Sequence, residues 1–170
     1  MKFFLLLILS FMCATVFAQT PEENLKAKNI ELPAVPKPVA SYVNVVRSGN
    51  LIFLSGKGPL KKDGTYITGK LGKDLTIEQG YEAARLTAII QIAVLKDYLG
   101  DLSKIKRIVK VLGIVNGTPE FYDQPKVING FSDLIVEIFG EKGKHARSAI
   151  GVSSLPMNIC VEVELIVEVE

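Results

Sequence analysis

The sequence has little of the chemistry that marks metal or redox sites. Its 170 residues contain no tryptophan, one histidine (His145) and two cysteines (Cys13 and Cys160). A zinc site needs several His, Cys or carboxylate ligands brought together, so we expect no metal and no cofactor. A Ser-His-Asp arrangement would depend on the same single histidine, and the sequence has no Gly-x-Ser-x-Gly motif.

Neither sign of charge is in large excess. Lysines and arginines number 20 and acidic residues 18, which gives a net charge of +2. Domains that bind nucleic acids usually carry a strongly basic face, so we expect no nucleic-acid partner. A ribonuclease for single-stranded RNA is disfavoured further, because a basic patch with interleaved aromatic residues is lacking and one histidine offers little for paired acid–base work.

Long apolar runs are absent except at the N-terminus, where one begins at Phe3. This run is too short to span a membrane, and the residues that end at Ala18 fit a signal-peptide cleavage site. We therefore predict a signal peptide at residues 1–18 and export to the periplasm or the medium, with no membrane contact after its removal. Cys13 raises a lipoprotein as the alternative, but the residue before it is not small.

After cleavage, Cys160 is the one remaining cysteine, so the mature protein is expected to have no internal disulfide. Residues 19–40 predict a tail or linker that is stiffened by proline, with a short helix between Glu22 and Ile30. Residues 41–170 are long enough for one domain with its own hydrophobic core.

Hydrophobic spacing predicts an α+β domain. A capping box at Thr76 and a stop at Gly100 bound an amphipathic helix, and Gly140 ends a second helix that begins near Asp123. The strands are predicted from β-branched and alternating runs. In chain order they are Ser41 to Arg47, Leu51 to Ser55, a short strand at Tyr66 and Ile67, Ile105 to Val115, and the two strands of a closing hairpin.

The last strand, from Val161 to Glu170, alternates apolar residues with mostly acidic ones. Two helices can cover one face of a single sheet but not both. The uncovered face is therefore expected to meet either water or another subunit, and we predict an oligomer.

The closing hairpin predicts an arginine–glutamate pair. A loop from Ser153 to Pro156 would place Arg147 directly opposite Glu162, with small residues beside them, because opposed residues share a face. One interpretation is a salt bridge on a solvated face, which contributes little to stability. The other is a site in which the guanidinium binds a small carboxylate through two parallel hydrogen bonds and the glutamate orients a water.

Four segments together resemble the Rid family, also called YjgF-like. They are Ser41 to Gly56 (SYVNVVRSGNLIFLSG), Gln79 to Arg85 (QGYEAAR), Val127 to Gly130 (VING), and the closing Ala146-Arg-Ser, Leu155-Pro and Val161-Glu-Val-Glu. The resemblance covers residues 41–170 in order. It implies a chorismate-mutase-like fold, in which a single mixed β-sheet has two helices packed on one face, and a homotrimer with clefts between subunits.

The resemblance also implies an activity, which is hydrolytic deamination of small reactive 2-imino and enamino acids to 2-keto acids and ammonia. It assigns carboxylate binding to Arg147 and positioning of the attacking water to Glu162. Tyr42 would close the cleft from a neighbouring subunit, while Ser55 and Asn129 match other cleft positions. The expected partner is a small metabolite that bears a carboxylate.

Three positions differ from the residues common in these deaminases. His145 stands in place of a proline and can reshape the cleft entrance, Lys57 replaces a glutamine and adds a positive charge, and Ala149 replaces a cysteine. The main alternative to a deaminase is a non-catalytic trimer that binds a small carboxylate in the same cleft.

Overall fold

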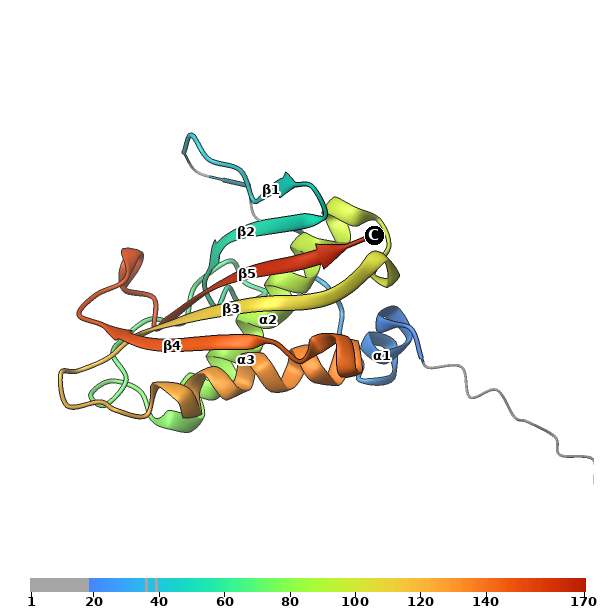
Figure 1. The fold of residues 1–170 in the computed structure, drawn as a ribbon. Helices are drawn as coiled ribbons and strands as arrows, with labels where there is room; N and C mark the ends of the chain where they lie inside the picture. Colours follow the sequence, from blue (N-terminus) through green and yellow to red (C-terminus); the bar gives the residue numbers. More distant parts are fainter. Residues whose placement is uncertain (1–18, 36, 39) are drawn as a thin grey trace, which may run out of the picture.

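The computed structural model describes residues 19–35, 37–38 and 40–170, and it places five strands in one mixed sheet (Figure 1). Strands β3 and β4 run parallel, and the other neighbouring pairs are antiparallel. Across the sheet the order is β1 (Val45–Ser48), β2 (Leu51–Lys57), β5 (Val161–Val169), β3 (Ile105–Asn116) and β4 (Ala146–Val152). The predicted signal peptide lies outside the described residues.

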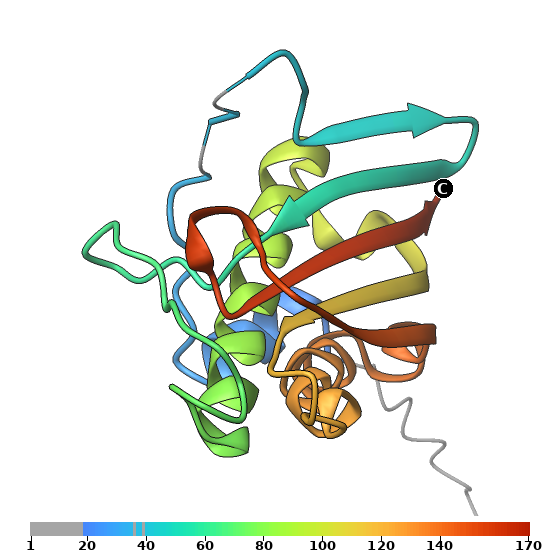
Figure 2. The same cartoon turned by 90° about the vertical axis from the view of Figure 1, so that its left-hand side faces the viewer.

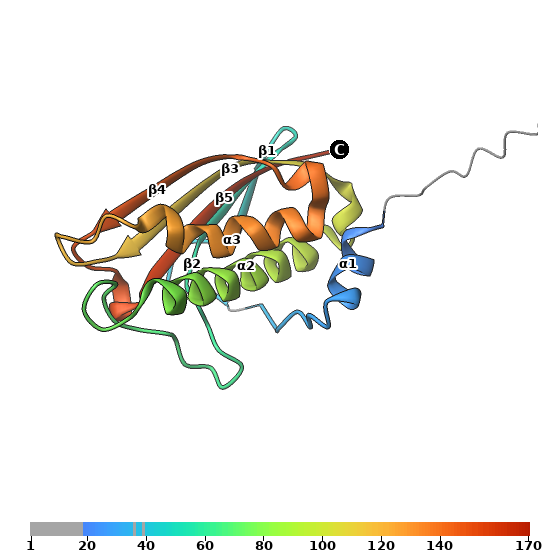
Figure 3. The ribbon, with the colours of Figure 1, turned by 90° about the horizontal axis from the view of Figure 1, so that it is seen from below.

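Two long helices, α2 (Ile77–Leu99) and α3 (Gln124–Phe139), lie side by side on one face of the sheet (Figure 3). The capping box predicted at Thr76 is present, and Gly100 ends α2 in the left-handed conformation. Both helices therefore begin and end within about one residue of the predicted positions, and the predicted α+β, chorismate-mutase-like fold is confirmed.

The core lies between this helix pair and the sheet. Strand β5 contributes alternate residues to it, because side chains along a strand point to opposite faces in turn. Those of β5 that point to the helices are all buried: Val161, Val163, Leu165, Val167 and Val169. The apolar face of α2 contributes Ala84, Ala88, Ile92 and Leu95 to the core, and these residues are buried as well.

None of the helices in the described part of the chain covers the opposite face of the sheet (Figure 3). It carries Val46 and Phe53, which pair across β1 and β2, and Ile150 on β4. These three side chains are 56%, 41% and 44% exposed. Val46 and Phe53 form one apolar pair, and Ile150 is a separate exposed residue three strands away from Phe53.

The predicted closing hairpin is wrong. Strand β3 lies between β4 and β5 (Figures 1 and 2), so these two strands are not neighbours. Arg147 pairs with Val111 of β3, whereas Glu162 pairs with Ile114, three residues further along the same strand. Helix α3 carries the chain back from β3 to a parallel edge strand, and the link from β4 to β5 then crosses over β3.

The same hairpin would place Ser148, Ile150 and Val152 on the core face and Arg147 on the opposite face, and the structure reverses this assignment. Val111, the neighbour of Arg147, is fully buried under the helices, and Ile150 on the other face is exposed. Arg147 therefore points to the helix side of the sheet, and Glu162 points to the open side. Because β4 is short and at the edge, its apolar residues do not have to face the core.

The predicted short strand at Tyr66 and Ile67 is reduced to isolated bridges, one of which joins Leu60 and Tyr66. The segment between β2 and α2 is a long loop that is held by single backbone contacts, such as the hydrogen bond from the Leu71 amide to the Asn116 carbonyl at 2.8 Å. No helix among the described residues is long and apolar enough to cross a membrane.

The segment predicted as a tail contains α1 (Pro21–Ala27), which packs beside the C-terminal end of α3 (Figure 3). Leu25 is buried, and the Asn24 side chain donates to the Ile138 carbonyl at 2.8 Å. Lys28 forms an ion pair with Glu137 at 3.0 Å. The predicted short helix is confirmed, and it contacts the folded domain.

Candidate functional site

One group of predicted site residues lies between β4 and α3. The Nη1 atom of Arg147 donates to the side-chain carbonyl of Asn129 at 2.9 Å and to the hydroxyl of Ser132 at 3.0 Å. Both hydrogens of Nη1 are thereby used. The Nε and Nη2 atoms donate to none of the described residues, and together they form the planar fork that binds a carboxylate through two hydrogen bonds.

Ser132 connects this arginine to His145. The hydroxyl lies 3.0 Å from Nε2 of the imidazole, and Nδ1 lies 2.6 Å from the Gly143 carbonyl oxygen. Burial lowers the pKa of His145, and the positive charge of Arg147 lowers it further, while the bond to Gly143 opposes both effects. Ser132 could not be predicted from the sequence, because its partners come together only when α3 packs on β4.

A second group of predicted site residues lies where β2 and β5 meet. A Cβ atom placed on Gly56 would lie 1.9 Å from Oε1 of Glu162, so the glutamate carboxylate lies directly against the glycine backbone. Burial raises the pKa of Glu162 and the nearby Glu164 raises it further, whereas Lys57 lowers it. The result is a half-buried carboxylate whose pKa lies above its usual range.

Lys57 is the charged neighbour of this glutamate. Its side chain is 9% exposed, and its amine donates to the side-chain carbonyl of Asn44 at 2.6 Å. Burial lowers the pKa of Lys57, and the negative charge of Glu162 opposes that shift. The residue that departs from the family pattern therefore contributes directly to the electrostatics of Glu162.

The segment before β1 lies against the same end of β2. The Ser55 hydroxyl donates to the Val43 carbonyl at 2.6 Å, and the Ser55 amide donates to the Asn44 carbonyl at 3.0 Å. Tyr42, next in the chain, is 48% exposed. Ser55 and Glu162 lie where β2 and β5 meet, and Tyr42 directly precedes the segment that contacts Ser55. We call these three residues the β2–β5 half. Arg147, Asn129, Ser132 and His145 form the β4–α3 half.

A buried glutamine shapes the β2–β5 half. The register between β2 and β5 shifts between Leu54 and Lys57. At this irregularity, the Gln91 amide donates to the Ser55 carbonyl at 3.1 Å and to the Val163 carbonyl at 2.7 Å. Gln91 is fully buried on α2. In the sequence, the one sign of this role is a polar residue among the apolar positions of the helix that pack on the core.

The two halves do not meet within one protomer. Arg147 and Glu162 point to opposite faces of the sheet, and their positions differ by three residues along the strands and by two strands across them. These steps amount to about 10 Å in each direction. A carboxylate bound to Arg147 therefore lies beyond the reach of Glu162 of the same protomer.

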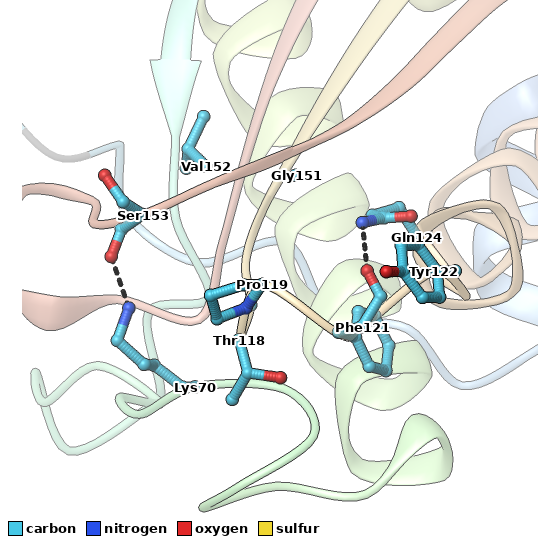
Figure 4. Close-up of a pocket in the computed structure, with 10 residues that line it drawn as sticks. Lys70, Thr118, Pro119, Phe121, Tyr122, Gln124, Gly151, Val152 and Ser153 are labelled. Atoms are coloured by element: carbon cyan, nitrogen blue, oxygen red, sulfur yellow. Dashed lines mark hydrogen bonds between the residues drawn. The ribbon is translucent and has the colours of Figure 1, made fainter.

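A cavity of about 530 Å³ lies at the other end of β4 (Figure 4). Tyr122, Gln124 and Gly151 line it, and the Gln124 amide donates to the Phe121 carbonyl at 2.5 Å. Lys70, on the opposite wall, donates to the Ser153 carbonyl and, at 2.8 Å, to the Asn116 side chain. The sequence did not predict this cavity, because its walls come from three loops, the first turn of α3 and the edge of β4.

The described residues include no group of three or more His, Cys, Asp or Glu side chains that could hold a metal ion. Cys160 is buried, and burial raises the pKa of its thiol to about 11. A thiol with so high a pKa is a weak nucleophile at neutral pH. The two halves themselves offer a guanidinium, which can bind a carboxylate, and a carboxylate with a raised pKa, which can accept a proton.

Comparisons with known proteins agree with the fold. A family model described as "YjgF/chorismate_mutase-like, putative endoribonuclease" matches residues 22–169. The chain is 44% identical over 146 residues to Protein TCP17 of Trypanosoma cruzi, and the match covers 85% of this chain and 91% of that protein. It is 28% identical over 142 residues to the 2-iminobutanoate/2-iminopropanoate deaminase of Dermatophagoides farinae, with 83% and 95% covered.

Among solved structures, the protein Atu1372 from Agrobacterium tumefaciens is similar to this chain with a TM-score of 0.82 and 43% sequence identity. The similarity covers 88% of this chain and 92% of that one. The matched range includes every strand of the sheet and both long helices. The chain therefore belongs to the YjgF/RutC/Rid family, which includes a 2-iminobutanoate deaminase.

Proposed function

We propose that the protein hydrolyses small 2-imino and enamino acids to 2-keto acids and ammonia, at sites shared between protomers. The β4–α3 half of one protomer would bind the substrate carboxylate, and the β2–β5 half of the next would direct water. One observation carries this proposal: each half has a chemical group ready for one part of the reaction, but the two halves lie on opposite faces of the sheet.

Substrate binding rests on Arg147. Its Nη1 atom is held by Asn129 and Ser132 from α3, which fixes the plane of the guanidinium before a ligand arrives. A prearranged fork loses less side-chain entropy on binding than a free one. Two charge-assisted hydrogen bonds from Nε and Nη2 would then set the orientation of a 2-imino acid by its carboxylate.

Hydrolysis rests on Glu162. Water adds its oxygen to the electrophilic iminium carbon while the carboxylate takes one proton from it, and this gives a carbinolamine. The proton on Glu162 then passes to the nitrogen, the carbon–nitrogen bond breaks with its electron pair, and ammonia leaves as the carbinolamine hydroxyl gives its proton back to the carboxylate and becomes the ketone oxygen. General-base catalysis is most effective when the pKa of the base is near the working pH. The raised pKa of Glu162 moves it in that direction.

This arrangement requires an oligomer, and we propose the homotrimer that the family resemblance implies. The open face of the sheet carries exposed Val46 and Phe53 beside the β2–β5 half, and exposed Ile150 on β4. Burial of these side chains against a second copy would bring the edge of one protomer close to the open face of another.

The first experiment tests turnover. Residues 19–170 are incubated with an amino-acid oxidase that generates 2-imino acids, and semicarbazide traps the imine that escapes hydrolysis. Diversion of imine to keto acid by wild type but not by Arg147→Ala supports the proposal. Failure to divert any of several imines, with keto-acid binding retained, identifies a carboxylate-binding protein instead.

A second experiment tests the shared site. Arg147→Ala and Glu162→Gln are each expected to be inactive, and mixed oligomers of the two are expected to regain activity. A site formed by Arg147 of one subunit and Glu162 of the other type is intact in such a mixture. Random mixing predicts about a quarter of wild-type turnover. No recovery in verified mixed oligomers would show that the two residues act within one subunit or not at all.

A further inference from the structure

His145, Ser132 and Arg147 are joined by hydrogen bonds whose directions can be assigned. The Gly143 carbonyl can only accept, so Nδ1 of His145 carries the hydrogen in the 2.6 Å contact. In the neutral ring, Nε2 is then an acceptor, and it receives the Ser132 hydroxyl hydrogen across 3.0 Å. The Ser132 oxygen is left to accept from Nη1 of Arg147, also at 3.0 Å.

We propose that His145 is a positioning residue for Arg147, which acts through Ser132 to hold the guanidinium fork open for a substrate carboxylate. This inference rests on the proposed function in that the ligand of Arg147 is taken to be a carboxylate. The neutral Nδ1–H tautomer supports the chain of bonds. Protonation of Nε2 would turn it into a second donor toward Ser132, and the serine hydroxyl would lose its acceptor.

The surroundings of His145 favour the neutral form. Arg147 on β4 places a positive charge beside it, and α3 contributes the uncharged Ser132 and Val136 to the same pocket. Lys144 lines that pocket as well, and it is paired with Glu141 at 2.7 Å. The remaining charged side chains of this part of the fold are engaged elsewhere: Lys142 with the Ile105 carbonyl, Asp133 with Tyr81 and Glu137 with Arg85.

Two substitutions distinguish the role of Nε2 of the histidine ring from the role of Nδ1. His145→Gln can present a side-chain carbonyl near the position of Nε2, and so can still accept from Ser132. His145→Asn can replace the Nδ1 donor to Gly143 but has no acceptor that reaches Ser132. A structural role of the histidine through Gly143 would be kept in His145→Asn and lost in His145→Gln, whereas the proposed role through Ser132 predicts the opposite.

Binding of 2-oxobutanoate, measured by calorimetry at pH 8 and at a pH below the His145 titration found by nitrogen NMR, tests this prediction, because burial and Arg147 lower the pKa of His145 below that of an ordinary histidine. Wild type is expected to bind more weakly at the lower pH. His145→Gln should bind at both pH values about as wild type does at the higher one. His145→Asn and Ser132→Ala should bind about tenfold more weakly at both. In turnover the same loss should fall on KM rather than on kcat.

Because His145 is the only histidine of the chain, nitrogen NMR of tag-free protein reports its tautomer and titration without ligand. We expect the Nδ1–H tautomer in wild type and a higher histidine pKa in Arg147→Ala, since the nearby charge is removed. An Nε2–H tautomer, or equal binding by His145→Asn and wild type, would overturn the proposal. Wild type could fail to bind 2-oxobutanoate while the tautomer and the titration are as expected. In that case the proposed class of ligand is wrong, but the hydrogen-bonded chain from His145 through Ser132 to Arg147 is supported.

Discussion

The two halves of the candidate site are built in different ways. In the β4–α3 half, Arg147 is held by Asn129 and Ser132 of helix α3, and Ser132 is bonded in turn to His145. In the β2–β5 half, Glu162 lies against the backbone of Gly56, and burial and neighbouring charge set its pKa. The first half controls the direction of a donor and the second controls the strength of a base. Substitutions should therefore affect ligand binding in one half and turnover in the other.

Arg147→Ala should have the largest effect. Loss of the guanidinium removes two charge-assisted hydrogen bonds to the ligand, so carboxylate affinity is expected to fall at least about 100-fold. The melting temperature should change little, because Arg147 lies on an edge strand. Calorimetry with 2-oxobutanoate measures the affinity. Arg107→Ala, which removes an exposed arginine paired with Glu168 at 3.6 Å, is the matched control; an equal loss there would point to a general charge effect.

Gly56→Ala should abolish turnover but not binding. The new methyl group would lie 2.8 Å or less from the carboxyl carbon and oxygen of Glu162, so the carboxylate must move. Loss of a positioned general base lowers kcat by about 100-fold or more. Carboxylate affinity should stay within a few-fold of wild type. Gly151→Ala is the control, because its methyl group meets the flexible end of Gln124. Wild-type kcat in Gly56→Ala would exclude Glu162 as the base.

Gln91→Met tests whether the hydrogen bonds of Gln91 stabilise the β2–β5 half. The substitution keeps the side-chain volume but leaves the carbonyls of Ser55 and Val163 without their donor. Among the described residues the Gln91 oxygen has no hydrogen-bond partner, so its loss costs nothing. We expect the free energy of unfolding to fall by about 1–3 kcal/mol and kcat to fall about tenfold more than affinity. Urea unfolding and steady-state kinetics measure the two effects; an equal fall in affinity would show that the halves are not independent.

The elements with strong periodic patterns were the ones that the sequence predicted well. Helix α2 has a capping box, a terminal glycine and a continuous apolar stripe, and β5 alternates over its whole length. Strand β4 has none of these. Arg147 to Val152 contains apolar residues on both faces, and a short loop after it favours a hairpin. The parallel pairing with β3 depends on the packing of α3, which is a long-range contact that local spacing does not contain.

The same limit applies to the site. Arg147 and Glu162 were predicted as a pair from a register that the structure overturns, and their assigned roles stay a prediction from the family resemblance. Ser132 and Gln91 were missed, because each gains its role from partners that lie far away in the sequence. What the sequence did contain was the chemistry of each group: an arginine with small neighbours and a glutamate on a strand face. Local spacing did not predict that the arginine and the glutamate lie on opposite faces of the sheet.

Lys57→Gln should give the smallest effect and the clearest sign. The lysine charge lowers the pKa of Glu162, while burial and Glu164 raise it. Removal of the charge therefore raises the pKa of Glu162 further above its ordinary value. A general base acts when it is deprotonated, so kcat/KM should rise with pH through the Glu162 pKa, and this acid limb should move to higher pH in the variant.

At a pH well above the acid limb, Lys57→Gln should keep nearly full turnover, since the base is then ionised in both proteins. The pH profile of kcat/KM measures the displacement, and Lys61→Gln, which removes an exposed amine near Asp63, controls for net charge. A shift to lower pH, or a loss of activity that is the same at every pH, would mean that Lys57 acts on the substrate rather than on Glu162. In that case Lys57 would contribute to substrate binding, as Arg147 does, and Arg147 would not be the only cation that contacts the ligand.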